Sequence, residues 1–258
     1  MTLIELMIAA SVMSLVAVVL GGLVHAVDTA RTHVEGMQEA SAQGRFAVDR
    51  IRAAVERSGT YRIGTGATVA GVAVVWNADQ PEILVVWTGG REDSRAHQSP
   101  LNRLPRANEL IIYAPDPNAP QRLVEIVVPS ATGSIDFDDS GFATRIRQII
   151  NSSTSDERVP LCDRVRIATK DSTTVAALRF EIEATPAKEL IASTATGTHA
   201  WRDLAWHGGV STNSSGLRRI LIRVEIQVLT QGTPGDTTSD VSLPVFGAAS
   251  RRYVYRKG

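Results

Sequence analysis

The sequence has almost no cysteine and no excess of either charge. Cys162 is the only cysteine among 258 residues, so no disulfide can form within the chain. Lysine plus arginine and aspartate plus glutamate both number 27, which gives no electrostatic reason to expect a nucleic-acid partner. A folded domain in this chain must therefore be held by packing, by hydrogen bonds or by a metal.

Charge is also missing from a long stretch near the N-terminus. The chain begins Met1-Thr2-Leu3-Ile4-Glu5 and then has no charged residue from Leu6 to Val24. About 20 apolar residues span a bilayer, and one charged side chain inside a bilayer costs about 3 kcal/mol. An acid in the first turn also suits the dipole of a helix, so Glu5 is explained either as a helix-start device or as a functional residue.

Residues 2–9, Thr-Leu-Ile-Glu-Leu-Met-Ile-Ala, resemble the mature N-terminus of type IV pilins and of the pseudopilins of type II secretion. In that family a prepilin peptidase removes a basic leader and methylates the new N-terminal amine. Met1 takes the place of the usual Phe, and because no leader precedes it, we expect the processed form. The resemblance implies that Met1 is the processing and methylation site. It also implies that Thr2, Leu3, Ile4 and Glu5 serve assembly, Glu5 by pairing with a neighbouring N-terminal amine.

Simpler explanations of this segment fit less well. A secretory signal peptide has a basic start and a small-residue cleavage site, whereas no Lys or Arg precedes Arg31 here. An ordinary membrane anchor fits the length and leaves Glu5 unexplained. The pilin resemblance accounts for both features.

The helical pattern continues beyond the apolar run. Apolar or small residues recur at alternating steps of three and four, which is typical of a helix packed against another surface. They are Val27, Ala30, Val34, Met37, Ser41, Gly44, Val48, Ile51 and Val55. We expect one helix from about residue 2 to 57, ending at Ser58-Gly59 with Gly59 as a left-handed cap. Arg45 with Asp49 and Arg52 with Glu56 are spaced to pair along it.

This helix is too long, at about 80 Å, to pack within one domain. We expect a hydrophobic transmembrane or filament-core part over residues 1–27, an amphipathic continuation over 28–58, and a globular β-rich domain over 59–258. Gly21 and Gly22 interrupt the apolar part. They serve either as a hinge, because Gly lowers helix propensity by roughly 1 kcal/mol, or as small residues for close helix contact.

Residues 38–49, which include Gly-Arg-Phe-Ala, resemble the helix end of large W-type minor pilins, and the J-type pseudopilin is similar in size and plan.

The later sequence is rich in short strand-like runs, some with clean alternation. They are Val72–Trp76, Ile83–Trp87, Glu109–Tyr113, Leu123–Val128, Val175–Glu183, Ile220–Leu229 and Arg251–Tyr255, with a weaker run at Arg164–Ala168. A short helix at Ala143–Ile150, a hairpin loop at 115–118 and surface loops over 184–215 complete the expectation. The predicted fold class is α+β: a long N-terminal helix packed on a C-terminal antiparallel β-sheet domain.

Other candidate sites are weaker. Asp136, Asp138 and Asp139 match the opening of a calcium loop, although Arg147 stands where the loop needs a bidentate Glu. A simpler Ca²⁺ site or a plain acidic turn are the alternatives. Asn151 and Asn213 begin Asn-x-Ser sequences that could accept a glycan.

No catalytic set is evident, so we expect no enzyme, and no cofactor apart from that Ca²⁺. The resemblance implies a subunit of a type IV pilus-like or pseudopilus filament. Its partners would be identical or related subunits, the prepilin peptidase, and an assembly platform with its ATPase. It would reside in a bacterial inner membrane before assembly and in a periplasmic or extracellular filament afterwards. The alternatives are a low-copy subunit that initiates assembly or caps the tip, and a membrane-anchored binding domain that never polymerises.

Overall fold

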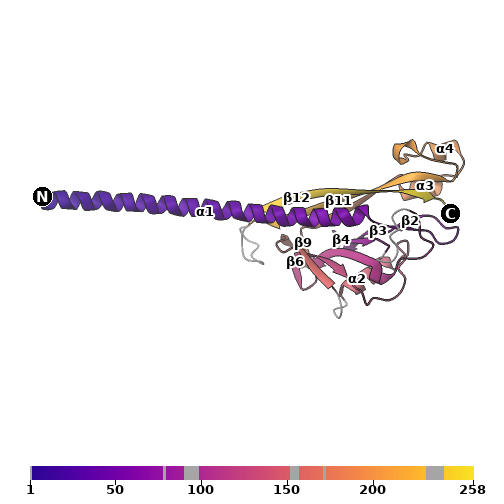
Figure 1. The fold of residues 1–258 in the computed structure, drawn as a ribbon, viewed down its shortest axis with the longest axis horizontal. Helices are drawn as coiled ribbons and strands as arrows, with labels where there is room; N and C mark the ends of the chain where they lie inside the picture. The colour runs from indigo at the N-terminus through magenta and orange to yellow at the C-terminus, as the bar shows by residue number, and fades with distance from the viewer. Residues whose placement is uncertain (1, 78–79, 90–98, 152–156, 171–172, 231–240) are drawn as a thin grey trace.

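The structure is a computed structural model that describes residues 2–77, 80–89, 99–151, 157–170, 173–230 and 241–258. Its dominant element is α1 (Leu3–Glu56), a single helix of 54 residues that projects from the globular part as a stalk (Figure 1). The expected long helix is therefore confirmed. It ends where predicted, but Gly59 is not among the described glycines with a positive φ, so the left-handed cap was wrong. Its N–H instead donates to the carbonyl of Trp87 at 2.7 Å.

A five-stranded antiparallel sheet forms one layer of the globular part. Its strands run in the order β3 (Val72–Asn77), β4 (Gln80–Trp87), β5 (Leu110–Asp116), β6 (Ala119–Val127) and β7 (Glu157–Cys162). A tight turn at residues 117–118, within the loop predicted at 115–118, joins β5 to β6 as a hairpin, whereas a longer connection that contains α2 joins β6 to β7. Helix α2 (Phe142–Asn151), also predicted, places Phe142, Ile146 and Ile150 in a core on one face of this sheet.

A three-stranded antiparallel sheet forms the other layer. It contains β10 (Leu178–Thr185) and two strands of 15 residues, β11 (Ser215–Leu229) and β12 (Ser242–Arg256), with β11 in the middle. The C-terminal part of α1 lies between the two sheets (Figure 1), and a second core joins all three. The predicted α+β class with a helix packed on antiparallel sheets is confirmed.

The remaining elements are short. Two small hairpins pair β1 (Thr60–Tyr61) with β2 (Val69–Ala70), and β8 (Ile167–Lys170) with β9 (Thr173–Ala176). The connection between β10 and β11 holds α3 (Lys188–Ser193), α4 (His199–Arg202) and the 3₁₀ turn η2 (His207–Gly209), while the 3₁₀ turn η1 (Ala107–Glu109) precedes β5.

Two expected strands and one expected loop region differ in detail from the structure. The run Val175–Glu183 divides between β9 and β10, and Arg251–Tyr255 is only the end of β12. The expected surface loops over 184–215 contain α3 and α4, and the Trp201 and Trp206 rings are buried there, with centroids 5.0 Å apart. Two large aromatic side chains in a polar segment outweighed its low aliphatic content, because they are buried in the core that α1 shares with the two sheets.

Candidate assembly helix and its attachment to the domain

The N-terminal half of α1 has no packing partner among the residues that the structure describes. Its most apolar 18-residue window has a mean hydropathy of 2.5 and none of that window is buried, so the helix is long and apolar enough to cross a membrane. The first buried residue of α1 is Ala40. At 1.5 Å per residue, roughly 55 Å of helix precedes it. An exposed apolar surface of this length marks a contact with lipid or with other protein.

The Glu5 carboxylate lies in the first turn of this exposed part. Its Oε2 accepts a hydrogen bond from the backbone N–H of Thr2 at 2.8 Å, as in a capping box. Leu3 and Ile4 are exposed beside it, and Met1 lies outside the described residues. In the single chain, Glu5 therefore stabilises its own helix start, and its role in assembly stays a prediction.

Gly21 and Gly22 lie within an unbroken helix. A Cβ added to either glycine would meet no atom within 4 Å, so neither residue is required by packing within the chain. In the single chain the helix is unbroken at these residues, so they do not form a hinge there. Both explanations, local unwinding and close contact with another helix, concern the assembled state and stay predictions.

Helix α1 packs closely against β12 because two glycines, one on each element, leave room for valines of the other. A Cβ on Gly44 would lie 2.6 Å from Cγ2 of Val245, and a Cβ on Gly247 would lie 2.2 Å from Cγ1 of Val48. Each valine thus fills the space that the opposing glycine leaves. The sequence placed Gly44 and Val48 on the packed stripe, but it could not identify Val245 and Gly247 as their respective partners.

An ion pair attaches the same helix to the five-stranded sheet. The Arg50 guanidinium donates from Nε and Nη2 to the two carboxylate oxygens of Glu125 on β6, both at 2.8 Å. The Glu125 side chain is 5% exposed and that of Arg50 is 55% exposed. Hydrogen bonding to Glu125, with its charge, raises the pKa of Arg50 above its usual value. Burial raises the pKa of the neighbouring Tyr113.

Sequence reasoning missed this pair, although a signal existed. Glu125 is the only charged residue in the apolar run Leu123–Val128. A lone acid in a buried strand predicts a basic partner, but it does not say which arginine.

Further contacts fix the rotation of α1 on the domain. Arg164 pairs with Glu39 at 3.3 Å, and Arg52 donates from Nε to the carbonyl of Ala248 on β12 at 3.2 Å. Arg52 pairs with Asp49 at 3.8 Å, and among the described residues neither Arg45 with Asp49 nor Arg52 with Glu56 forms the pair that their spacing allowed.

The acidic loop of residues 136–141 is bonded to the rest of the domain. Asp136 Oδ1 accepts from the Tyr61 hydroxyl at 2.7 Å, and Asp138 Oδ1 accepts from Lys188 Nζ at 2.7 Å. Asp139 lies 3.5 Å from Arg145. No group of three or more potential metal ligands occurs among the described residues. These carboxylates hold the loop in place, and a Ca²⁺ ion would have to displace the Tyr61 hydroxyl and the cations of Lys188 and Arg145.

The candidate modification sites and the cysteine lie far from the stalk in sequence. Asn151 is the exposed last residue of α2, and the exposed Asn213 accepts from Arg202 Nη2 at 3.0 Å. Cys162 is buried, and desolvation raises the pKa of its thiol to about 11. A thiol in this environment is a structural group rather than a nucleophile.

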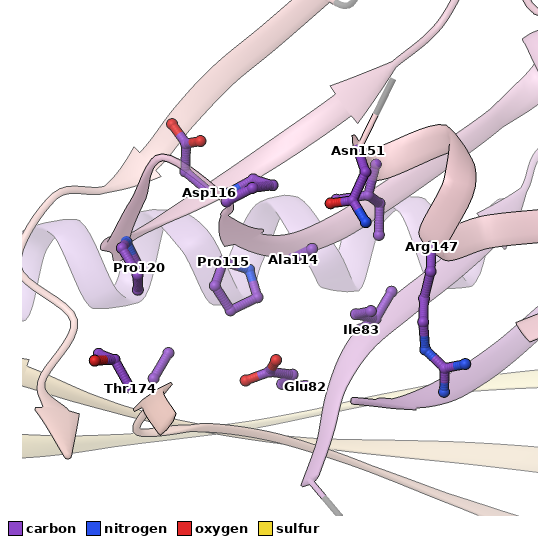
Figure 2. A pocket seen from close by; sticks show the side chains of 12 residues that line it. Glu82, Ile83, Ala114, Pro115, Asp116, Pro120, Arg147, Asn151 and Thr174 are labelled. Carbon is purple, nitrogen blue, oxygen red and sulfur yellow. The ribbon is translucent and has the colours of Figure 1, made fainter. Parts of the chain in front are cut away.

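A small cleft lies between the C-terminal end of α2 and β4, β5 and β9 (Figure 2). Its volume is about 230 Å³, and prolines form much of its wall: Pro115, Pro117 and Pro120. Asp116 is paired with Arg158 at 3.2 Å, and the Arg147 guanidinium donates to the carbonyl of Trp76. These charged groups are therefore engaged in bonds that hold the fold.

No protein-family model, no curated protein and no solved structure matches this chain. Its layout, a long apolar N-terminal helix followed by a β-sheet domain, is consistent with that of pilins.

Proposed function

We propose that this chain is a structural subunit of a type IV pilus-like or type II pseudopilus filament. A prepilin peptidase processes and methylates the N-terminus of the subunit. The subunit then resides in a bacterial inner membrane, anchored by the N-terminal half of α1. A platform with an ATPase then extracts it into a periplasmic or extracellular filament. Identical or related subunits surround its helix there.

The observation that carries this proposal is the unpartnered half of α1 together with Glu5. A stalk whose most apolar window is not buried by any described part of the chain needs lipid or neighbouring helices around it. Glu5 stabilises its own helix start, but a carboxylate next to an apolar, membrane-length helix is a costly placement in lipid alone. A neighbouring N-terminal ammonium gives a reason for this placement, because a buried pair of opposite charges fixes the register between subunits.

The α1–domain contacts support the same role. The helix is held on the domain by the Gly44–Val245 and Gly247–Val48 contacts and by the Arg50–Glu125 pair. Force applied to the stalk during extraction is therefore transmitted directly to both sheets. A domain joined by a flexible linker would not move with its helix in this way.

The test is a comparison of Glu5→Ala with Glu35→Ala, a matched loss of one exposed acid on the same helix. Each variant is produced behind a prepilin leader in cells that contain a pilus or type II secretion platform. Both variants should insert in the membrane and fold. Filaments counted by electron microscopy should fall at least about tenfold for Glu5→Ala, the effect of losing roughly 1.4 kcal/mol per contact, and stay normal for Glu35→Ala.

Normal filament yield from Glu5→Ala without wild-type subunits would contradict the role of Glu5. A wild-type chain that inserts and folds but never enters filaments would favour the membrane-anchored binding domain instead. The number of copies per filament, counted by mass spectrometry, separates a main subunit from one that starts or caps the filament. Filaments with one copy each would identify the second kind.

A further inference from the structure

The outer face of the three-stranded sheet is open to solvent. Side chains alternate between the two faces of a strand, and the inward residues of β12, such as Val245 and Gly247, meet α1. The outward residues of β11 and β12 are half-buried or exposed. They include Leu217, Arg219, Leu221, Arg223, Phe246, Ala248, Ser250, Arg252, Val254 and Arg256.

Charges on one half of this face are balanced by ion pairs. Arg179 lies 2.6 Å from Glu181, while Arg223 lies 3.6 Å from Glu181 and 2.9 Å from Glu183. This half carries cations and anions side by side and needs no external partner.

The other half carries arginines and no acid. Arg219 of β11 lies directly opposite Arg252 of β12 in the register, and Arg256 follows on the same face of β12. Among the described residues, no ion pair and no side-chain hydrogen bond involves any of these three guanidinium groups. Like charges placed directly opposite each other destabilise a sheet, so an acidic partner at this position would relieve the repulsion between Arg219 and Arg252.

Apolar side chains alternate with these arginines. Val254, which is 50% exposed, lies opposite Leu217, between Arg252 and Arg256 along β12. Val254 and Arg256 also border a groove of about 470 Å³ whose wall includes Arg62 and Asn102. The surface therefore combines aliphatic side chains with arginines that have no ion-pair partner among the described residues, and arginine is enriched at protein interfaces.

The location suits contact with a partner outside the membrane. The ends of β11 and β12 that carry these residues lie near the C-terminus, at the opposite end of the molecule from the start of α1 (Figure 1). A partner bound there would not compete with lipid or helices around the stalk. Function at this face is thus separable from assembly.

We propose that Arg219, Arg252 and Arg256, here named the arginine face, bind an acidic segment of a partner protein. Carboxylates of the segment pair with the guanidinium groups, which present planar forks suited to bidentate bonding. Aliphatic side chains of the segment lie on Val254 and Leu217. A protein fits better than a uniform polyanion because cations alternate with apolar residues, and because a net charge of zero gives no long-range attraction for a polyanion.

The test uses the full chain in neutral detergent and a fluorescein-labelled peptide of alternating glutamate and leucine. Binding is followed by fluorescence anisotropy at low salt. The triple variant Arg219→Gln/Arg252→Gln/Arg256→Gln should weaken binding about tenfold, as expected for three exposed charge pairs, and added salt should weaken wild-type binding. A matched control, Arg45→Gln/Arg106→Gln/Arg122→Gln, makes the same change in net charge elsewhere and should bind as the wild type does.

Three results would overturn the proposal. The first is no binding, or equal binding of a glutamine–leucine peptide that lacks the charge. The second is an equal loss of affinity in both triple variants, which would reduce the effect to net charge. The third is tighter binding of heparin or polyphosphate than of the peptide at the arginine face, which would identify a polyanion as the ligand. None of these results depends on filament formation, so they leave the proposed function untouched.

Discussion

We predict that replacing Arg50 destabilises the domain more than replacing Glu125, although the two residues form one ion pair. Both residues contribute to the same two hydrogen bonds of 2.8 Å, so a count of contacts predicts equal effects for Arg50→Met and Glu125→Gln. Their surroundings predict otherwise. Glu125 is 5% exposed and cannot turn toward water, whereas Arg50 is 55% exposed and can.

The magnitudes follow from what each variant leaves behind. Arg50→Met leaves a carboxylate in the core, for which about 3–5 kcal/mol is typical. The partial exposure of Arg50 reduces this to about 2–3 kcal/mol. Glu125→Gln leaves a guanidinium that water can solvate, and costs about 1 kcal/mol. The double variant Arg50→Met/Glu125→Gln removes both charges and should be more stable than Arg50→Met alone.

Thermal unfolding of the full chain in detergent, followed by tryptophan fluorescence, measures these differences. For a domain of this size, 1 kcal/mol corresponds to about 2–4 °C in Tm. Trp87, Trp201 and Trp206 are buried and report on the domain rather than on the stalk. Arg45→Met is the control, because Arg45 lies on the same helix. The Tm of this variant should equal that of the wild type. Equal losses for the two single variants, or additive losses in the double variant, would refute the reasoning.

Three further predictions concern single elements. Because burial raises the pKa of the Cys162 thiol to about 11, about one thiol in a thousand is ionised at about pH 8. A disulfide reagent should therefore label the native chain far more slowly than the unfolded chain, and reductant should not change Tm. Fast labelling of the native chain would contradict this prediction. Gly247→Ala should cost about 2 kcal/mol through overpacking, and Val48→Ala should partly rescue it in thermal unfolding, so purely additive effects would show that Val48 is not the obstacle. Gly21→Ala/Gly22→Ala should restore roughly 2 kcal/mol of helix propensity and give stiffer or fewer filaments, whereas a regular helix through Gly22 in a wild-type filament map would show that these glycines serve close packing.

Much of the fold could be predicted because local patterns decided it. The stripe from Val27 to Val55 and the absence of proline before Pro81 determined α1. Alternating residues determined strands such as β11, where each strand buries one face. The segment over 184–215 could not be predicted in this way, since its order depends on Trp201 and Trp206 packing against distant strands.

For the candidate site, the sequence by itself determined the apolar stalk, the isolated acid at Glu5 and the lack of any disulfide, because each follows from composition and helical spacing alone. Only the tertiary structure decided which strand receives α1, that Gly247 makes room for Val48, and that Arg50 reaches Glu125. It also brought Arg219 beside Arg252. These pairs are 33 to 199 residues apart in the chain. No local pattern encodes such contacts, since strand register and sheet packing are set by burial of both cores together.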